Sequence, residues 1–368
     1  MAGDIDFADD PELERLRAEG RELPCGEVAA AAVAALIPQV HGGRGLGFVR
    51  TTALLEGVGH ALTTPLSVLP DITRAVLTAV PLWQLGTARQ RETYLPAVAA
   101  GWRSGGISLL ELQGGAMDIT AQASFARTGD GGSRLDARKG QLLGADQADH
   151  FLVTAADDPS GLSACLVERG LPGTCVAAEE GTLLLRGCDV PDDAFVGTRG
   201  AALSEFVPLL LALDRSVLLA PWLGIMRHLI QRSVRGAREG RLFGRGTDGF
   251  QHVRADIADM RARYELSAGL VHRAAAQLDS RARPSRADAA AAKLYVVEAA
   301  RAVAERALRI QGMAGEPPSR FLEQVLVAAS RIEHTGAGTG TLRSVVAETE
   351  LSAAAERRKA GASHSALV

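Results

Sequence analysis

The chain has 368 residues, of which 47% are hydrophobic and 23% are charged, the proportions of a globular protein that buries a sizeable interior. This length exceeds that of a usual single domain, so we expect more than one compact core. The 40 basic and 43 acidic residues give a net charge of −3, and no long basic run occurs. Nucleic-acid-binding proteins carry a basic stripe, so the charge pattern argues against nucleic acid as a partner.

Aromatic residues make up only 4% of the chain, so alanine and leucine supply much of the core, which favours helices. The four cysteines form no CxxC pair and have no histidines at ligand spacing, which favours buried thiols in a reducing cytosol over disulfides or a metal site. They are Cys25, Cys165, Cys175 and Cys188. The acidic N-terminus contains no apolar signal segment, so we expect a cytoplasmic protein.

Residues 1–104 form the first predicted domain, and it is helical. Apolar residues recur at three- and four-residue spacing, and glycine and proline breakers separate the periodic stretches. The predicted helices are 27–36, 49–61, 73–80 and 89–99.

Residues 105–198 form the second predicted domain. Residues 120–126 alternate polar and apolar side chains, and the sequence Gly-Asp-Gly-Gly at 129–132 is a strong turn signal. Further short β-forming runs lie at 150–154, 163–167, 174–178 and 182–185. The pattern predicts a small antiparallel, barrel-like β domain.

Residues 199–368 return to long helical segments, which predict a C-terminal four-helix bundle. The stretch 207–226 is nearly long enough to span a membrane, but Asp214 and Arg215 lie in its middle. A charge at the centre of a bilayer costs about 2.5–3.5 kcal/mol. We therefore expect a buried helix of a soluble bundle and no membrane partner. The four predicted helices are 203–238, 250–278, 286–311 and 318–331.

Five short motifs follow one another along the chain. They are GTARQRETYLP at 86–96, CDVP at 188–191 with Val196-Gly197, FG at 243–244 with FQ at 250–251 and ADM at 258–260, IQGMAG at 310–315, and GT at 338–339. In this order they resemble the motifs of the acyl-CoA dehydrogenase superfamily of flavoproteins. The resemblance implies an α+β fold with an N-terminal helical domain, a middle β domain and a C-terminal four-helix bundle.

The same resemblance implies FAD, bound between the β domain and the C-terminal helices, with part of the site supplied by a second subunit. A homodimer or homotetramer and an electron acceptor are therefore expected. The usual chemistry of these proteins removes an acidic proton from an acyl thioester by a carboxylate while hydride passes to flavin N5. The protein aligns the base, the substrate and the flavin, and polarises the thioester carbonyl.

The position of the catalytic base departs from the common pattern. Most relatives carry it as the glutamate of YEGT, but this chain has Ala337 there, and a methyl group cannot accept a proton. A minority, similar to isovaleryl-CoA dehydrogenase, carries the base in a segment like LERLVLA. The matching segment here is LDRSVLLA, which places Asp214 at the base position beside Arg215. The backbone N–H of Ala337 remains able to polarise a thioester carbonyl.

Other interpretations of these residues stay open at this point. Asp214 and Arg215 are also compatible with a buried ion pair that has no catalytic role. Glu333 and His334 lie close to the terminal motif and are alternative bases.

The flavin-binding segments are also altered. The family's TEPxxGSD is LELQGGAM here, and its WITN is QLLG, so hydroxyl contacts and a tryptophan are lost while backbone contacts can remain. Gly240 replaces the family's pyrophosphate-binding arginine, so Arg238 or Arg241 is expected to substitute. Arg309 replaces a glutamine and either binds a phosphate or lies on a solvated helix face. The resemblance places the FAD contacts at Leu110, Gly115, Ala116, Leu142, Leu143, Arg241, Phe243, Gln251, Arg309, Gly312, Thr339 and Thr341.

Overall likeness points most closely to the dehydrogenase that helps to make hydroxymalonyl- and methoxymalonyl-acyl carrier protein for polyketide synthases. That likeness implies a three-carbon hydroxyacyl unit bound as a thioester to an acyl carrier protein or to CoA. Three alternatives remain: a short or branched-chain acyl-CoA dehydrogenase, a flavin monooxygenase on the same fold, and a non-redox assembly partner.

Overall fold

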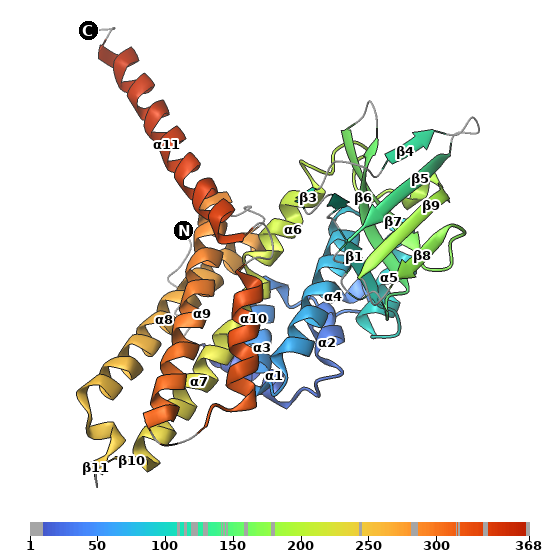
Figure 1. Cartoon of the computed structure of the whole chain (residues 1–368). Helices are drawn as coiled ribbons and strands as arrows, with labels where there is room; N and C mark the ends of the chain where they lie inside the picture. Colours follow the sequence, from blue (N-terminus) through green and yellow to red (C-terminus); the bar gives the residue numbers. More distant parts are fainter. Residues whose placement is uncertain are drawn as a thin grey trace. The chain divides into compact units, whose positions relative to one another are not determined.

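The computed structural model contains two compact units (Figure 1). One comprises Met1–Glu22, Phe48–Leu66 and Asp214–Val368, and the other comprises Leu23–Gly47 and Ser67–Leu213. The structure describes residues 10–365 except 109–110, 114–115, 119–123, 128–131, 141, 143, 145, 158–160, 178–180, 243–244, 281–285, 314, 316 and 334–337. The three-domain boundaries at 104 and 198 remain a prediction.

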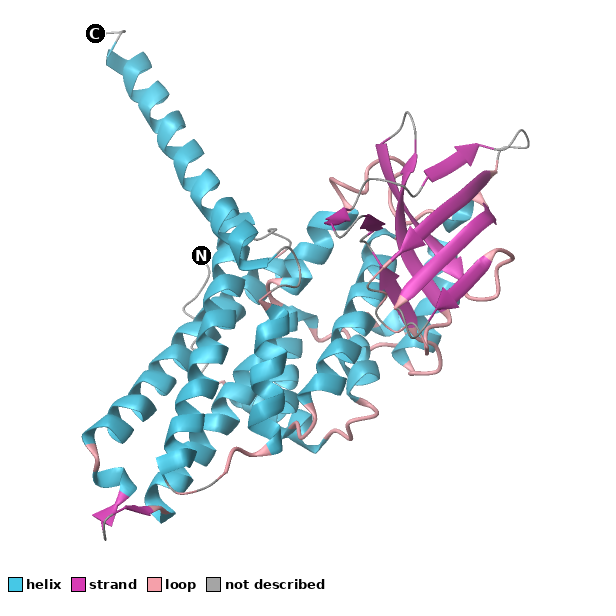
Figure 2. Ribbon diagram, in the orientation of Figure 1, coloured by secondary structure: helices cyan, strands magenta, loops and turns pink. Residues whose placement is uncertain are grey.

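The element order is helices, then strands, then helices, as predicted from the sequence. Figure 2 distinguishes the helices from the strands by colour. The first helices are α1 (Pro11–Glu22), α2 (Val28–Leu36), α3 (Gly47–Ala61), α4 (Pro65–Leu85) and α5 (Ala88–Ala99). The strands that follow are β1 (Gly105–Ser108), β2 (Glu111–Gln113), β3 (Ala116–Asp118), β4 (Ser124–Arg127), β5 (Ser133–Lys139), β6 (His150–Asp157), β7 (Gly161–Glu168), β8 (Thr174–Ala177) and β9 (Thr182–Val190).

In the described C-terminal part of the chain, β10 and β11 pair antiparallel and the other elements are helices. Its elements are α6 (Phe206–Asp214), α7 (Ala220–Glu239), β10 (Arg241–Leu242), β11 (Arg245–Gly246), α8 (Gln251–Asp279), α9 (Arg286–Met313), α10 (Arg320–Ile332) and α11 (Gly338–Ser365). α11 is a helix that the sequence patterns did not predict.

The strands β1 to β9 form one mixed sheet. β5 pairs antiparallel with β4 and β9, and β6 pairs antiparallel with β7. β6 also lies parallel to β1 and, through one residue pair, to β4. The expected fold class is therefore confirmed, while the prediction of a wholly antiparallel sheet was wrong in these two pairings.

Helices α2, α4 and α5 pack with this sheet into one apolar core. Its buried members include Ile37 from α2's end, Leu82 from α4, Leu95 from α5 and Leu152 from β6. Thr87 and Gln90 form a reciprocal capping box that starts α5. The Gln90 side-chain amide also donates to the carbonyls of Asp193 and Phe195, so the cap joins α5 to the chain leaving the sheet.

Within the other unit, glycines allow helix backbones to approach closely. A Cβ added at Gly57 would lie 2.1 Å from the carbonyl oxygen of Arg17, and one at Gly224 would lie 2.0 Å from that of Glu56. Gly59 meets α7 in the same way, at the carbonyl oxygen of Pro221. These positions fix α3 directly against α1 and α7 because no side chain separates the backbones.

A buried polar network crosses the same helices. The Glu56 carboxylate is 1% exposed and accepts hydrogen bonds from Arg17 Nε at 2.8 Å and from Tyr264 Oη at 2.6 Å. His272 and Arg227 lie 3.9 Å and 3.8 Å from this carboxylate. Despite burial, these partners hold the pKa of Glu56 down at about 2, so the carboxylate is ionised in the folded protein.

Two stretches of the described chain are long and apolar enough to span a membrane by length and composition alone. They are Pro65–Leu85 and Phe206–Glu239, of which the most apolar windows are 56% and 83% buried inside the protein. Burial of this extent is typical of core helices, so the stretches carry no evidence for a membrane location.

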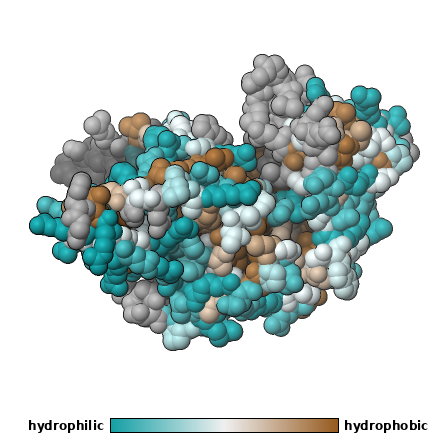
Figure 3. Space-filling model, turned by 60° about the horizontal axis from the view of Figure 1, so that its bottom comes forward, coloured by the Kyte–Doolittle hydropathy of each residue, from teal (hydrophilic) through white to brown (hydrophobic). Residues whose placement is uncertain are grey.

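The described surface mixes hydrophilic and apolar side chains (Figure 3). Its large exposed apolar residues are dispersed over helices and connecting segments and form no continuous stripe along one helix: Val40, Trp102, Leu203, Leu266, Val327 and Leu351. The four cysteines are free thiols, as expected. Cys165 and Cys188 are buried, but Cys25 and Cys175 are exposed, so the prediction of burial was wrong for those two.

Candidate active site

A helix break lies at the residues that the sequence places at the base position. α6 ends at Asp214, and α7 begins at Ala220 with Pro221 in its first turn, where proline's missing N–H costs nothing. Between them Ser216 has φ −140° and ψ −101°, neither helical nor extended. Asp214 and Arg215 therefore do not interrupt one continuous helix, as the sequence suggested, but occupy the junction of two.

Asp214 forms a close ion pair at this junction. Lys293 Nζ lies 2.6 Å from Asp214 Oδ2, with the lysine side chain 1% exposed and the aspartate side chain 20% exposed. Arg215 is itself buried, at 3% exposure. The junction thus combines a partly accessible carboxylate with a buried ammonium group contributed by α9.

The sequence motifs do not include Lys293. The available signal was its rarity: three of the 40 basic residues are lysines, and this one lies within the apolar run AAAAKLYVV. A lone charge in such a run is either buried with a partner or aligned on a solvated face. The spacing could not identify its partner, because 79 residues separate Lys293 from Asp214.

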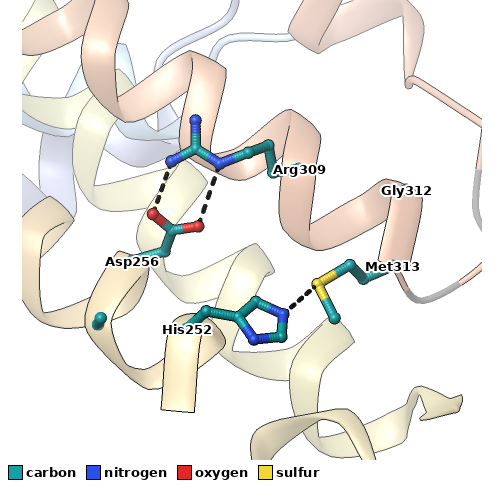
Figure 4. Close-up of a pocket in the computed structure, with 6 residues that line it drawn as sticks. His252, Asp256, Arg309, Gly312 and Met313 are labelled. Atoms are coloured by element: carbon teal, nitrogen blue, oxygen red, sulfur yellow. Dashed lines mark hydrogen bonds and ion pairs between the residues drawn. The ribbon is translucent and has the colours of Figure 1, made fainter. Parts of the chain in front are cut away.

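A second group of site residues lines a cavity of about 530 Å³ between α8 and α9 (Figure 4). Arg309 donates two hydrogen bonds to Asp256, from Nη2 at 2.6 Å and from Nε at 3.3 Å. His252 Nε2 lies 2.8 Å from Met313 Sδ. The sequence predicted Arg309 and Gly312 here but neither His252 nor Asp256, which stand one and five residues after the FQ motif's Gln251.

The residues that line this cavity can be compared with what the phosphate groups of FAD require. Arg309 and His252 contribute cationic or hydrogen-bonding nitrogen atoms to the cavity. The 29-residue helix α8 begins at Gln251, so its N-terminal end lies next to His252 in the chain. A Cβ added at Gly312 would meet no atom within 4 Å, so its side of the cavity is open. These features fit a phosphate group. Asp256 is the competing anion, and it must share Arg309 with a bound phosphate or release it.

The remaining described site residues of the same unit are placed as follows. Arg241 on β10 and Gln251 at the start of α8 are exposed, as is Thr341 on α11. The Thr339 N–H donates to the Glu333 carbonyl at 3.1 Å. Glu333 pairs with Arg301 at 3.1 Å, which commits this alternative base to an ion pair.

The sheet residues belong to the other unit. Leu142 is buried in the sheet core, and its N–H donates to the Gly181 carbonyl at 2.8 Å. Ala116 lies in β3, paired with Gln113. Predicted site residues that lie outside the described part of the chain are Leu110, Gly115, Leu143, Phe243 and Ala337, together with His334. Among the described residues, no cluster of His, Cys, Asp or Glu has the arrangement of a metal site.

Two family models match the chain. Residues 11–102 match the N-terminal domain of acyl-CoA dehydrogenases, and residues 208–361 match their C-terminal domain. The first match includes Glu56 on α3, and the second includes Asp214, Lys293 and Arg309.

Several curated proteins are similar along most of the chain. Benzylmalonyl-CoA dehydrogenase of Aromatoleum aromaticum is 30% identical over 331 residues, covering 86% of this chain and 85% of that protein. L-prolyl-[peptidyl-carrier protein] dehydrogenase of Pseudomonas fluorescens is 28% identical over 316 residues, covering 82% of each. Mitochondrial isovaleryl-CoA dehydrogenase of Arabidopsis thaliana is 27% identical over 328 residues, covering 85% and 79%.

Solved structures share the fold. The prolyl acyl carrier protein oxidase AnaB superimposes with a TM-score of 0.83 at 23% identity, over 92% of this chain and 99% of that one. PigA in complex with FAD gives 0.82 at 20% identity, over 94% and 99%. Glutaryl-coenzyme A dehydrogenase gives 0.83 at 23% identity, over 95% and 97%.

Proposed function

Because this chain belongs to the acyl-CoA dehydrogenase family, we propose that it oxidises a short acyl thioester with Asp214 as the proton acceptor. Family membership makes it an FAD-dependent oxidoreductase, as the sequence resemblance implied. The observation that carries the proposal is the partly exposed Asp214 carboxylate at the break between α6 and α7, the position at which the minority branch carries its base.

The chain's own residues provide binding and proton transfer. FAD, when bound, would supply the two-electron oxidant for the reaction. Arg309 and His252 would hold the anionic part of the cofactor in the α8–α9 cavity. Asp214, fixed at one oxygen by Lys293, would accept the substrate proton at its other oxygen as hydride leaves carbon.

The proposed substrate is a three-carbon hydroxyacyl unit on an acyl carrier protein, as in the biosynthesis of methoxymalonyl extender units for polyketides. Its oxidation removes the hydroxyl proton to Asp214 and a hydride from the carbon that bears the hydroxyl group. The similarity to a dehydrogenase of a carrier-bound prolyl group supports a carrier thioester. Aspartate is one methylene shorter than the glutamate of the minority branch, which is compatible with a different reacting atom.

A second candidate is the ordinary α,β-dehydrogenation of an acyl-CoA. The 30% identical relative acts on benzylmalonyl-CoA, so a CoA thioester has a specific observation in its favour. In this reaction Asp214 would accept the proton from the carbon next to the thioester carbonyl.

We also propose that the protein is cytoplasmic and works as a homodimer or homotetramer with a separate electron acceptor. Part of each FAD site would then come from the neighbouring subunit. Mass determination in solution, with and without FAD, tests the assembly.

Anaerobic titration of the yellow holoenzyme tests the proposed function. A three-carbon hydroxyacyl thioester on a carrier protein should bleach the flavin absorption, and the same acyl group on CoA should do so less efficiently. Bleaching by saturated acyl-CoA alone would replace the first candidate with the second. Protein that takes up no FAD, or a flavin that no thioester of either kind reduces, would contradict both.

A further inference from the structure

We infer that Lys293 is a positioning residue that acts through Asp214: it fixes one carboxylate oxygen and leaves the other for the substrate proton. The inference rests on the proposed role of Asp214 as base. It assigns a function to a residue that neither the sequence motifs nor the expected FAD contacts identify.

The contact geometry is the first support. Lys293 Nζ approaches Asp214 Oδ2 to 2.6 Å, which is a charge-assisted hydrogen bond as well as an ion pair. Because Oδ2 is taken, Oδ1 is the oxygen left to accept a proton. The aspartate side chain remains 20% exposed while the lysine side chain is 1% exposed, so the accessible member of the pair is the carboxylate.

The surroundings of Lys293 are the second support. It projects from a section of α9 whose neighbouring residues are buried: Ala289, Ala290, Ala292, Val296 and Val297. Packing of this kind restricts the lysine stem to few rotamers. A buried ion pair is also screened less by solvent than a surface pair, so it holds its geometry more strongly. Charge at this place costs desolvation energy, and a buried ammonium is therefore expected to serve a definite partner.

The backbone at Asp214 is the third support. Asp214 is the last residue of α6, and Ser216 beyond it is not helical. Asp214 therefore lies at the end of its helix, and the ion pair connects this end to α9. Lys293 supplies the anchor from a separate helix, and a lysine gives a single-point contact where an arginine fork would engage both oxygens. In a chain with 37 arginines among 40 basic residues, that choice of lysine is notable.

Lys293 transfers no proton in this account. The substrate would lose a proton to Asp214 Oδ1 and be oxidised by two electrons, for which bound FAD would supply the two-electron oxidant. Lys293 keeps its three protons throughout. The Lys293 ammonium first contacts the Asp214 carboxylate and, after proton transfer, the neutral carboxylic acid. The first contact is restored when Asp214 releases the proton.

The test compares wild type with Lys293→Met, Lys293→Arg, Asp214→Asn and the double variant Asp214→Asn/Lys293→Met, each loaded with FAD. Single-turnover flavin reduction under anaerobic conditions gives a limiting rate and a half-saturating substrate concentration for each. FAD content and circular dichroism are measured in parallel. Glu12→Gln is the control, because it removes a surface pair with Arg50 on helices α1 and α3, which carry none of the predicted site residues, and should change neither parameter.

We expect Lys293→Met to lower the limiting rate about 100-fold, the size of loss that a small misplacement of a reacting group causes. The half-saturating concentration should stay within about threefold, since the interaction is not with substrate. Lys293→Arg should recover little of the rate, because an arginine fork would engage the second carboxylate oxygen as well. The double variant should reduce flavin no more slowly than Asp214→Asn, because a residue that acts through Asp214 has nothing left to position.

A wild-type rate in Lys293→Met, or a double variant whose losses multiply, would overturn the inference. If Lys293→Met does not fold, the double variant, which leaves no lone buried charge at the pair, and Lys293→Arg still decide. An Asp214→Asn enzyme with a wild-type rate would instead reject the proposed function. The two failures are thus distinguishable.

Discussion

His150 shows how a single buried residue couples the fold to pH. It starts β6 with its ring fully buried, 5.1 Å from the ring of Tyr94. Neither ring nitrogen has a hydrogen-bond partner in the described part of the chain. Burial, and secondarily the charge of Arg103, lowers the pKa of His150 from 6.5 to about 4.

Replacing His150 with leucine is therefore expected to stabilise the protein in acid. The unfolded chain binds the proton near pH 6.5 and the folded chain only near pH 4, so the free energy of unfolding falls as pH drops below about 6.5 and levels off below about 4. His150→Leu should remove about 2 kcal/mol of that loss at pH 5. Urea unfolding at pH 8 and pH 5 measures it, and an equal pH dependence in both proteins would contradict the assignment.

At the residue scale the sequence predicted one member of the Asp214–Lys293 ion pair. Asp214 was identified because its charge stands in an apolar run that matches a known segment, and the structure places it at an accessible junction. Lys293 was not, because the pairing depends on how α9 packs against the α6–α7 junction. Likewise, no spacing rule reveals that Asp256 competes for Arg309.

At the scale of elements, the crossing of α3 and α7 depends on glycines. Gly224 has no room for a Cβ: the carbonyl oxygen of Glu56 would be 2.0 Å away and the N of His60 2.4 Å away. Gly236 lies on the same helix α7, but a Cβ there would meet nothing within 4 Å. The two positions form a matched pair on one element.

Substitution by alanine should have opposite effects at these two positions. Gly224→Ala forces the helices apart and should lower the free energy of unfolding by about 3 kcal/mol or more. Gly236→Ala removes only the helix penalty of glycine and should stabilise by about 0.5–1 kcal/mol. Thermal unfolding of the two variants beside wild type measures the difference. Equal effects of the two substitutions would show that the close α3–α7 contact does not form.

A second prediction at the scale of elements concerns the polar network that joins α1, α3 and α8. Glu56→Gln keeps the shape but removes the charge that Arg17 and Tyr264 bind, and should cost about 3–5 kcal/mol. The exposed pair of Arg261 and Glu265 on α8 provides the control, since Glu265→Gln should cost less than about 1 kcal/mol. Urea unfolding measures both free energies. Equal losses of unfolding free energy in Glu56→Gln and Glu265→Gln would refute a structural role for the network.

Most elements could be predicted from periodicity, and the exceptions have physical reasons. The helices 49–61, 89–99 and 250–278 correspond to α3, α5 and α8 within one or two residues. The predicted helix 203–238 is instead α6 and α7, because its apolar pattern continues through a break that only the backbone at Ser216 reveals. Parallel pairing of β1 with β6 joins segments more than 40 residues apart, beyond any local pattern.

At the scale of the whole molecule, the order of motifs predicted the fold class, because each weak motif stands at the right place relative to the others. The helical–β–helical order of elements followed from the periodicity patterns, and the family followed from the motifs taken together with that order. Composition alone gave only a large helical protein.

FAD removal should lower the stability of the whole molecule. A ligand that binds only the folded state stabilises it by about 2.7 kcal/mol at a free concentration 100 times its dissociation constant. The apoprotein should therefore melt at lower temperature than the holoprotein, and its melting temperature should rise with added FAD. A melting temperature that does not respond to FAD would contradict binding to the native state.

The most direct test of the central claim is the rate of flavin reduction in Asp214→Asn. Asparagine keeps the size of the side chain but cannot accept the substrate proton. With FAD bound and the reactive thioester saturating, we predict a loss of about 100- to 10,000-fold, the usual contribution of a general base. Reduction of the flavin at the wild-type rate would contradict the assignment of Asp214 as the base.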